Sequence, residues 1–114
     1  SHHQKIVVID DSFAICGGID MTGDRWDKPA HADEEPGRVR PNGKPYGPWH
    51  DVTMAVDAPL ARALAELARD RWHRATGERL PVLPLREDLW PDGLEPQYRG
   101  SRFGVARTQA PYKE

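Results

Sequence analysis

The sequence predicts an α/β fold in which a small mixed sheet packs against one long helix. Two short apolar runs, the first of them β-branched, stand close together near the N-terminus, and a third apolar run follows much later in the chain. A segment with helical periodicity comes directly after the third run. The chain has 114 residues, which is enough for one domain with a modest core.

The two N-terminal runs predict a pair of antiparallel strands. Residues 6–9 form the first run, and the polar residues 10–12 after it indicate a turn. Residues 13–16 form the second run, which Gly17 and Gly18 close. Because the connection is short, we expect the two strands to pair as a hairpin.

The third strand and the helix are expected between residues 52 and 77. Residues 52–56 alternate only loosely, which is typical of a mostly buried strand. Pro59 favours a helix start, Asp57 can cap it or complement its dipole, and Gly77 ends it. The apolar positions that share one face of this helix, and that we expect to pack on the sheet, are Leu60, Leu64, Leu67, Ala68 and Trp72.

Irregular segments are predicted on both sides of this unit. Residues 21–47 are rich in charged residues, proline and glycine, and predict a long excursion over the surface. Trp26 in this loop either shapes the rim of a site or tethers the loop, and both interpretations stay open. Residues 77–100 carry four prolines and predict an extended linker pinned by Trp90, whereas residues 101–108 alternate and predict a strand.

The composition favours a soluble or peripheral membrane protein, with 38% hydrophobic and 30% charged residues. The net charge of −2 gives no general attraction to nucleic acid, although a local patch could still meet a lipid head group. Cys16 is the single cysteine, so we expect a buried thiol and no internal disulfide. No apolar stretch is long enough to span a bilayer.

His3 and Lys5 form the most informative pattern in the chain. They stand two residues apart where the first strand begins, so their side chains share a face. An ammonium group neutralises phosphoryl oxygens, and an imidazole either attacks phosphorus when neutral or transfers a proton when charged. The pair therefore predicts phosphodiester chemistry. The alternative is that His2 and His3 are ordinary surface residues, or the remains of a purification tag, at a frayed terminus.

Further polar and glycine residues extend this pattern. Gly17 and Gly18 would let the backbone approach a ligand closely, and Asp20 on the same loop could orient a neighbouring group. Asp10 is roughly 23 Å from His3 along an extended chain, at about 3.3 Å per residue. We therefore expect Asp10 to hold the strand turn or to form a salt bridge.

The spacing of these residues resembles the signature of the phospholipase D superfamily, His-x-Lys-x4-Asp-x6-Gly-Gly/Ser. The chain has His3 and Lys5, then four residues, Asp10, six residues, and the glycine pair. Gly-Gly-Ile-Asp at 17–20, Arg-Trp-Asp at 25–27 and Pro-Trp-His-Asp at 48–51 resemble segments of eukaryotic-like phospholipases D. The resemblance runs from residue 1 to about residue 76, and more weakly to the end.

The resemblance implies a partial phospholipase D-like α-β-α sandwich and a specific set of roles. The catalytic residues would be His3, Lys5, Asp10 and Asp51, with His3 as the nucleophile that becomes phosphohistidine and Lys5 holding the phosphoryl oxygens. Asp51 resembles the carboxylate that orients the histidine of a second motif. Substrate-binding residues would be Gly17, Gly18 and Asp20, although many family members carry asparagine in place of Asp20.

The family's second His-x-Lys motif is absent from this sequence, because His31, His50 and His73 have no lysine two residues on. We therefore expect the N-terminal half of a catalytic domain, whose N-terminus is truncated and which is inactive alone. Residues 1–76 would hold the motif, strands and helix, residues 77–100 the linker, and residues 101–114 the start of the second half.

The complete enzyme is expected to act on phospholipid at a membrane surface, with the second half downstream as its partner. It would cleave phosphatidylcholine-like lipids to phosphatidate and alcohol, or pass the phosphatidyl group to another alcohol. No cofactor and no nucleic acid partner are expected. The alternatives are a cardiolipin-synthase-like phosphatidyltransferase, a nuclease that builds its site from two identical chains, and a non-catalytic module that binds anionic lipid head groups.

Overall fold

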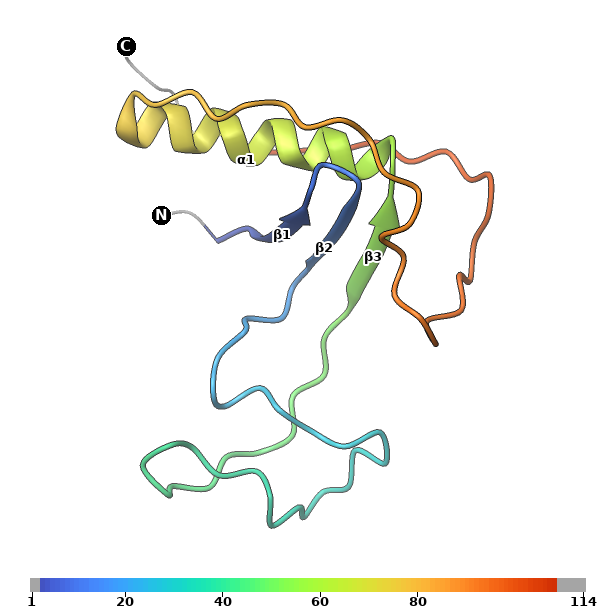
Figure 1. The fold of residues 1–114 in the computed structure, drawn as a ribbon. Coiled ribbons are helices and arrows are strands. Elements are labelled where there is room, and N and C mark those ends of the chain that lie inside the picture. Colours follow the sequence, from blue (N-terminus) through green and yellow to red (C-terminus); the bar gives the residue numbers. More distant parts are fainter. Residues whose placement is uncertain (1–2, 109–114) are drawn as a thin grey trace. The chain divides into compact units, whose positions relative to one another are not determined.

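The computed structural model describes residues 3–108 and contains three strands followed by one helix. The strands are β1 (Lys5–Ile9), β2 (Phe13–Gly17) and β3 (Thr53–Asp57), and the helix is α1 (Leu60–Thr76). The strands form one sheet in the order β1-β2-β3 (Figure 1). The predicted α/β class, the three strands and the long helix are therefore confirmed.

The sheet is antiparallel, so the prediction of a mixed sheet is wrong. The loop after β2 returns to the same end of the sheet from which it left, and β3 consequently runs opposite to β2 (Figure 1). The amide of Gly18 donates to the carbonyl oxygen of Val52 over 3.1 Å, which extends this pairing beyond the strand ends. The larger sandwich implied by the family resemblance stays a prediction.

The hairpin between β1 and β2 has a tight two-residue turn. Asp10 and Asp11 have φ values of 46° and 56°, and positive φ at both central positions is the signature of a type I′ turn. The amide of Ser12 closes the turn by donating to Ile9 over 3.0 Å. Aspartate tolerates this left-handed conformation better than most residues, because its short side chain bonds locally.

The chain divides into two compact units. The first comprises Ser1–Val7 and Ile15–Ala55, and the second comprises Val8–Ala14 and Val56–Glu114. The buried hydrophobic side chains of the second unit come from β2, β3 and α1, and they are Phe13, Ala14, Val56, Ala61, Leu64, Ala65 and Leu67. The apolar core of the described chain thus belongs to the second unit.

The buried face of α1 differs from the predicted face. Leu64 and Leu67 are buried as expected, but Trp72 is 45% exposed and its indole nitrogen donates to Glu78 over 3.0 Å. Ala61 and Ala65 are buried instead, because small side chains permit close packing at the start of the helix. Gly77 ends α1 as predicted, with φ of 77° and a hydrogen bond to His73.

The predicted helix start is only partly correct. Pro59 occupies the N-cap position, and no side chain caps the helix through a hydrogen bond. Asp57 is the last residue of β3 and therefore does not act as the expected cap.

The linker after α1 is irregular, as predicted, and crosses back along the second unit (Figure 1). Trp90 pins it through an edge-to-face contact with Phe13, with ring centroids 5.6 Å apart. The backbone amide of Leu83 also donates to Asp11 over 3.0 Å, and that of Arg86 donates to Ser12 over 2.8 Å. The hairpin turn and Phe13 thus hold the linker.

The strand predicted from alternation at residues 101–108 is absent, and these residues are exposed. A strand needs a paired neighbour to satisfy its backbone groups, and residues 101–108 pair with neither edge strand of the sheet, β1 nor β3. The rest of the predicted second-half segment, residues 109–114, lies outside the described residues, as does His2.

Candidate functional site

His3 and Lys5 are in direct contact at the start of β1. The Lys5 ammonium nitrogen lies 2.7 Å from Nε2 of His3 and also donates to the His3 carbonyl oxygen over 3.3 Å. An ammonium group can only donate, so Nε2 must accept through its lone pair. The imidazole is then neutral, with its proton on Nδ1. This is the form of histidine that nucleophilic attack requires.

Asp20 joins this pair from the loop after β2. Its Oδ1 lies 3.2 Å from the Lys5 ammonium, and its Oδ2 lies 3.7 Å from Arg25. Arg25 in turn contacts Asp24 over 2.6 Å. We call these four residues of alternating charge the ion-pair chain. The sequence predicted that Asp20 orients a neighbouring group, and the structure shows that this neighbour is Lys5.

The charge of Asp24 holds the far end of the ion-pair chain. The Thr22 hydroxyl, which donates over 2.8 Å, lowers the pKa of Asp24 most, and partial desolvation raises it. The nearby guanidinium groups of Arg25 and Arg40 lower it further, so that the pKa lies below its ordinary value. Asp24 therefore stays ionised and anchors Arg25 at neutral pH.

Gly17 and Gly18 face the segment that enters β3. A Cβ atom on Gly18 would lie 2.7 Å from both Cγ and Oδ2 of Asp51, and one on Gly17 would lie 2.5 Å from the Val52 carbonyl oxygen. Neither glycine has a positive φ, so close approach and not backbone freedom requires glycine here. The glycine pair brings Asp51 against the end of β2.

Asp51 is exposed, and its Oδ1 accepts a hydrogen bond from the Val52 amide over 2.7 Å. This bond and the close packing on Gly18 fix the carboxylate at the entry to β3. The structure therefore brings together two groups of predicted residues within the first unit. These are His3, Lys5 and Asp20 in one group, and Gly17, Gly18 and Asp51 in the other.

Asp10 belongs to the second unit and has a separate set of contacts. Its Oδ2 lies 3.3 Å from Arg86, which also contacts Asp88 over 2.7 Å. The salt bridge and turn position expected for Asp10 are both present. Sequence reasoning did not identify Arg86 as the partner, because the two residues lie far apart along the chain.

Arg25 and Trp49 form a contact that sequence reasoning missed. The Arg25 guanidinium carbon lies 3.8 Å above the Trp49 ring, within the range of a cation–π interaction. Arg25 belongs to the Arg-Trp-Asp segment and Trp49 to the Pro-Trp-His-Asp segment, both of which resemble family segments. That resemblance was the one sequence signal that pointed to these residues. No local spacing rule predicts that the two segments meet.

The loop of residues 21–47 is built around a buried arginine. Arg38 is 2% exposed, donates to the carbonyl oxygens of Ala32 and Asp33, and lies 3.8 Å from Asp27. Trp26 lies against Gly37, where a Cβ would come within 2.8 Å of the ring. This contact favours the tethering interpretation of Trp26. A polar centre thus orders a loop whose sequence predicts only a surface excursion.

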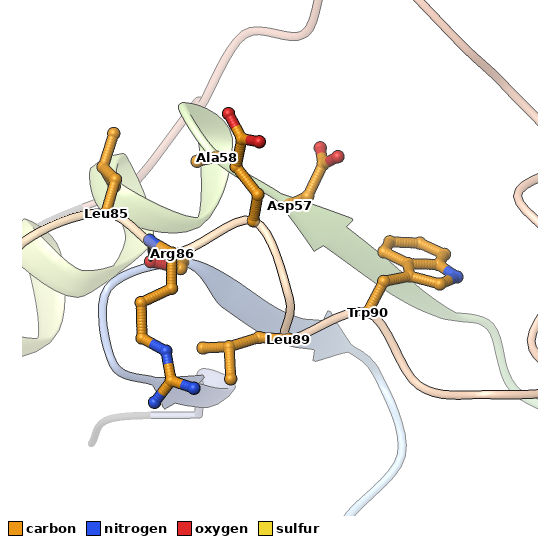
Figure 2. A pocket seen from close by; sticks show the side chains of 8 residues that line it. Asp57, Ala58, Leu85, Arg86, Leu89 and Trp90 are labelled. Atoms are coloured by element: carbon orange, nitrogen blue, oxygen red, sulfur yellow. Dashed lines mark hydrogen bonds between the residues drawn. The ribbon is translucent and has the colours of Figure 1, made fainter.

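The hollow drawn in Figure 2 lies in the second unit and contains none of the predicted site residues. It has a volume of about 390 Å³ and lies where the linker passes the end of β3. Its lining residues are Ser12, Asp57, Ala58, Leu85, Arg86, Glu87, Leu89 and Trp90.

Two features are absent from residues 3–108. These residues hold no group of three or more histidine, cysteine or acidic side chains arranged to bind a metal ion. Within the same range, no helix combines the length and the apolar character needed to cross a lipid bilayer.

Alanine substitution of the two glycines should separate their roles. We expect Gly17→Ala to destabilise the fold by about 1–3 kcal/mol, because the new Cβ meets the backbone of β3. Gly18→Ala should cost less, because the Asp51 side chain can move, but it should shift the Val52 amide resonance. Thermal unfolding and NMR measure both effects. Gly47→Ala is the control, since a Cβ there meets nothing within 4 Å; equal effects at all three positions would contradict the prediction.

Curated relatives match most of this chain but only a small part of their own length. "Phospholipase D alpha 1" of Vigna unguiculata is 30% identical, over 76% of this chain and 14% of the relative. "Phospholipase D alpha 2" of Arabidopsis thaliana is also 30% identical, with the same two coverages. "Phospholipase D C" of Dictyostelium discoideum is 30% identical over 66% of this chain and 6% of the relative. No family model and no solved structure matches the chain.

Proposed function

Because the chain belongs to the phospholipase D superfamily, we propose that it carries one half of a phospholipase D-type phosphodiesterase site. The observation that carries this proposal is the contact of 2.7 Å between Nε2 of His3 and the Lys5 ammonium. It sets a nucleophilic lone pair beside a cation suited to phosphoryl oxygens. The second half of the site would come from a downstream part of the full-length protein.

In the first step, a phosphoryl oxygen takes over the Lys5 hydrogen bond that occupies Nε2 of His3. The freed lone pair attacks phosphorus, a P–N bond forms, and the P–O bond to the head-group alcohol breaks. A histidine of the second half donates a proton to the leaving oxygen. Lys5 stabilises the negative charge that develops on the phosphoryl oxygens.

In the second step, the same partner histidine removes a proton from water. The resulting hydroxide attacks phosphorus, and the P–N bond breaks to release phosphatidate and restore His3. An alcohol in place of water gives transfer of the phosphatidyl group by the same route.

The remaining residues have supporting roles in this proposal. Asp51 is exposed and held at the entry to β3, so it is available to orient the partner histidine. Asp20 acts on the Lys5 ammonium and not on the substrate. A carboxylate would repel the anionic diester. Gly17 and Gly18 keep Asp51 in place, and Asp10 stabilises the β1–β2 turn.

The proposed substrate is a phosphatidylcholine-like phospholipid at a membrane surface. The names of the relatives support phospholipid over nucleic acid, and a net charge of −2 also disfavours a polyanionic partner. The proposed chemistry uses a covalent histidine intermediate and invokes no cofactor.

Trapping the intermediate tests the proposal. Full-length protein exposed to phosphatidylcholine labelled in its phosphatidyl group, and then quenched with denaturant, should carry an acid-labile label on the peptide that contains His3. The P–N bond is expected to survive base and to break in acid. An acid-stable label, or a label on a peptide without His3, would show that His3 is not the nucleophile.

A further inference from the structure

Asp20 lies between two cations and is shared unequally by them. Its Oδ1 is 3.2 Å from the Lys5 ammonium, whereas its Oδ2 is 3.7 Å from Nη2 of Arg25, beyond hydrogen-bond distance. The Lys5 side chain is 13% exposed and that of Arg25 is 19% exposed, whereas Asp20 is 40% exposed, so water screens both contacts from the Asp20 side. In this state the Asp20 carboxylate makes its closer ion pair with Lys5.

The Lys5 ammonium already has three close partners in this arrangement. It contacts Nε2 of His3, donates to the carbonyl oxygen of His3, and forms an ion pair with Asp20. A phosphoryl oxygen that binds Lys5 must therefore replace existing partners. It would also meet the negative charge of Asp20, which disfavours binding while that carboxylate stays in place.

Arg25 is positioned to take Asp20 away from Lys5. Its Nη1 is held by Asp24 over 2.6 Å, and its guanidinium lies 3.8 Å above the Trp49 ring. These two contacts fix the guanidinium while its Nη2 faces Asp20. A small movement of the carboxylate would form a charge-assisted hydrogen bond to Arg25.

We propose that phosphate binding transfers Asp20 from Lys5 to Arg25, which makes Arg25 a positioning residue for the phosphoryl site. Arg25 then acts through Asp20 and does not touch the phosphate. Trp49 keeps the guanidinium in place during the exchange. This inference rests on the proposed function, because it requires a phosphoryl group at Lys5.

A double-mutant cycle with inorganic phosphate tests the transfer. Phosphate is titrated into the full-length protein, and the His3 ring and the Gly18 amide are followed by NMR. Arg25→Gln should weaken phosphate binding roughly fivefold, because Asp20 then stays with Lys5, and Asp20→Asn should strengthen it by a similar factor. In the Asp20→Asn background, Arg25→Gln should have no further effect, since no carboxylate remains to be moved.

Arg40→Gln is the matched control, because Arg40 lies 3.6 Å from Asp24 and its replacement removes the same charge from the same loop. It should leave phosphate binding unchanged within about twofold. If Arg25→Gln weakens binding equally in both backgrounds, Arg25 contacts phosphate directly and the transfer is wrong, although the proposed function stands. Weaker binding by Asp20→Asn alone would also overturn the transfer. If phosphate does not shift the His3 and Gly18 resonances of the unaltered chain, both proposals fail.

Discussion

Replacing His3 with asparagine is expected to lower phosphatidylcholine turnover by the full-length protein by about a thousandfold or more. Asparagine retains polarity but has no nucleophilic ring nitrogen, so the P–N intermediate cannot form. Lys5→Gln should give a loss of similar order, because the two side chains act as a unit through their contact of 2.7 Å. Turnover of labelled lipid and the yield of acid-labile label measure both effects.

His31→Asn is the matched control for the histidine substitution. His31 has a φ of 45°, and asparagine is among the residues that tolerate this conformation best, so the loop should keep its shape. Its ring contacts Asp27 over 2.8 Å and takes no part in the proposed chemistry, so we expect turnover within a few-fold of the unaltered protein. If His3→Asn left turnover and label unchanged, the role assigned to His3 would be wrong.

Replacing Asp11 with asparagine should destabilise the fold by about 3–5 kcal/mol. Asp11 is 5% exposed and accepts hydrogen bonds from Arg69 over 2.5 Å and from the Leu83 amide over 3.0 Å. Asparagine removes the negative charge and leaves the half-buried Arg69 without its counterion. A loss of this size is a large fraction of the free energy of unfolding, because native proteins are only marginally stable. Urea unfolding measures the difference.

The Asp11 contribution should also depend on pH in one direction. Burial raises the pKa of Asp11, but the hydrogen bonds from Arg69 and Leu83 and the charges of Arg69 and Arg62 outweigh it. The folded pKa therefore lies below its ordinary value of 3.8. The stabilisation is complete above the unfolded pKa and is lost as the pH falls through the lower folded value.

The stability difference between the unaltered chain and Asp11→Asn should consequently narrow as the pH is lowered from 7 towards about 3 and below. Asp92→Asn, at an exposed turn residue, should show no comparable difference at any pH. A gap that stays constant over this range would mean that Asp11 does not stabilise the fold through its charge.

Local sequence patterns predicted the strands and the helix, but they did not predict how these elements pair with one another. The strands, α1 and its end at Gly77 follow from periodicity and from residue types within a few positions. The direction of β3 depends on where the loop of residues 21–47 returns, which no local pattern encodes. For the same reason, alternation at residues 101–108 predicted a strand, but this segment pairs with neither edge strand of the sheet.

The candidate site shows the same division. The contact of His3 with Lys5 follows from a spacing of two on one strand. The contacts of Asp20 with Lys5, of Gly18 with Asp51, and of Arg25 with Trp49 join segments that only tertiary structure brings together. The buried Arg38 could not be foreseen either, because arginine in a charged segment normally indicates an exposed side chain.

At the Asp10-Asp11 turn, the residue types that the turn conformation favours differ from those that the long-range contacts require. Asn-Gly would suit a turn with two positive φ values better than two aspartates do. Yet Asp10 binds Arg86 of the linker, and Asp11 binds both Arg69 of α1 and the Leu83 amide. An engineer who installed the ideal hairpin turn would thus improve the hairpin and disconnect it from the helix and the linker. Consensus design that scores turns in isolation would weaken this domain at that point.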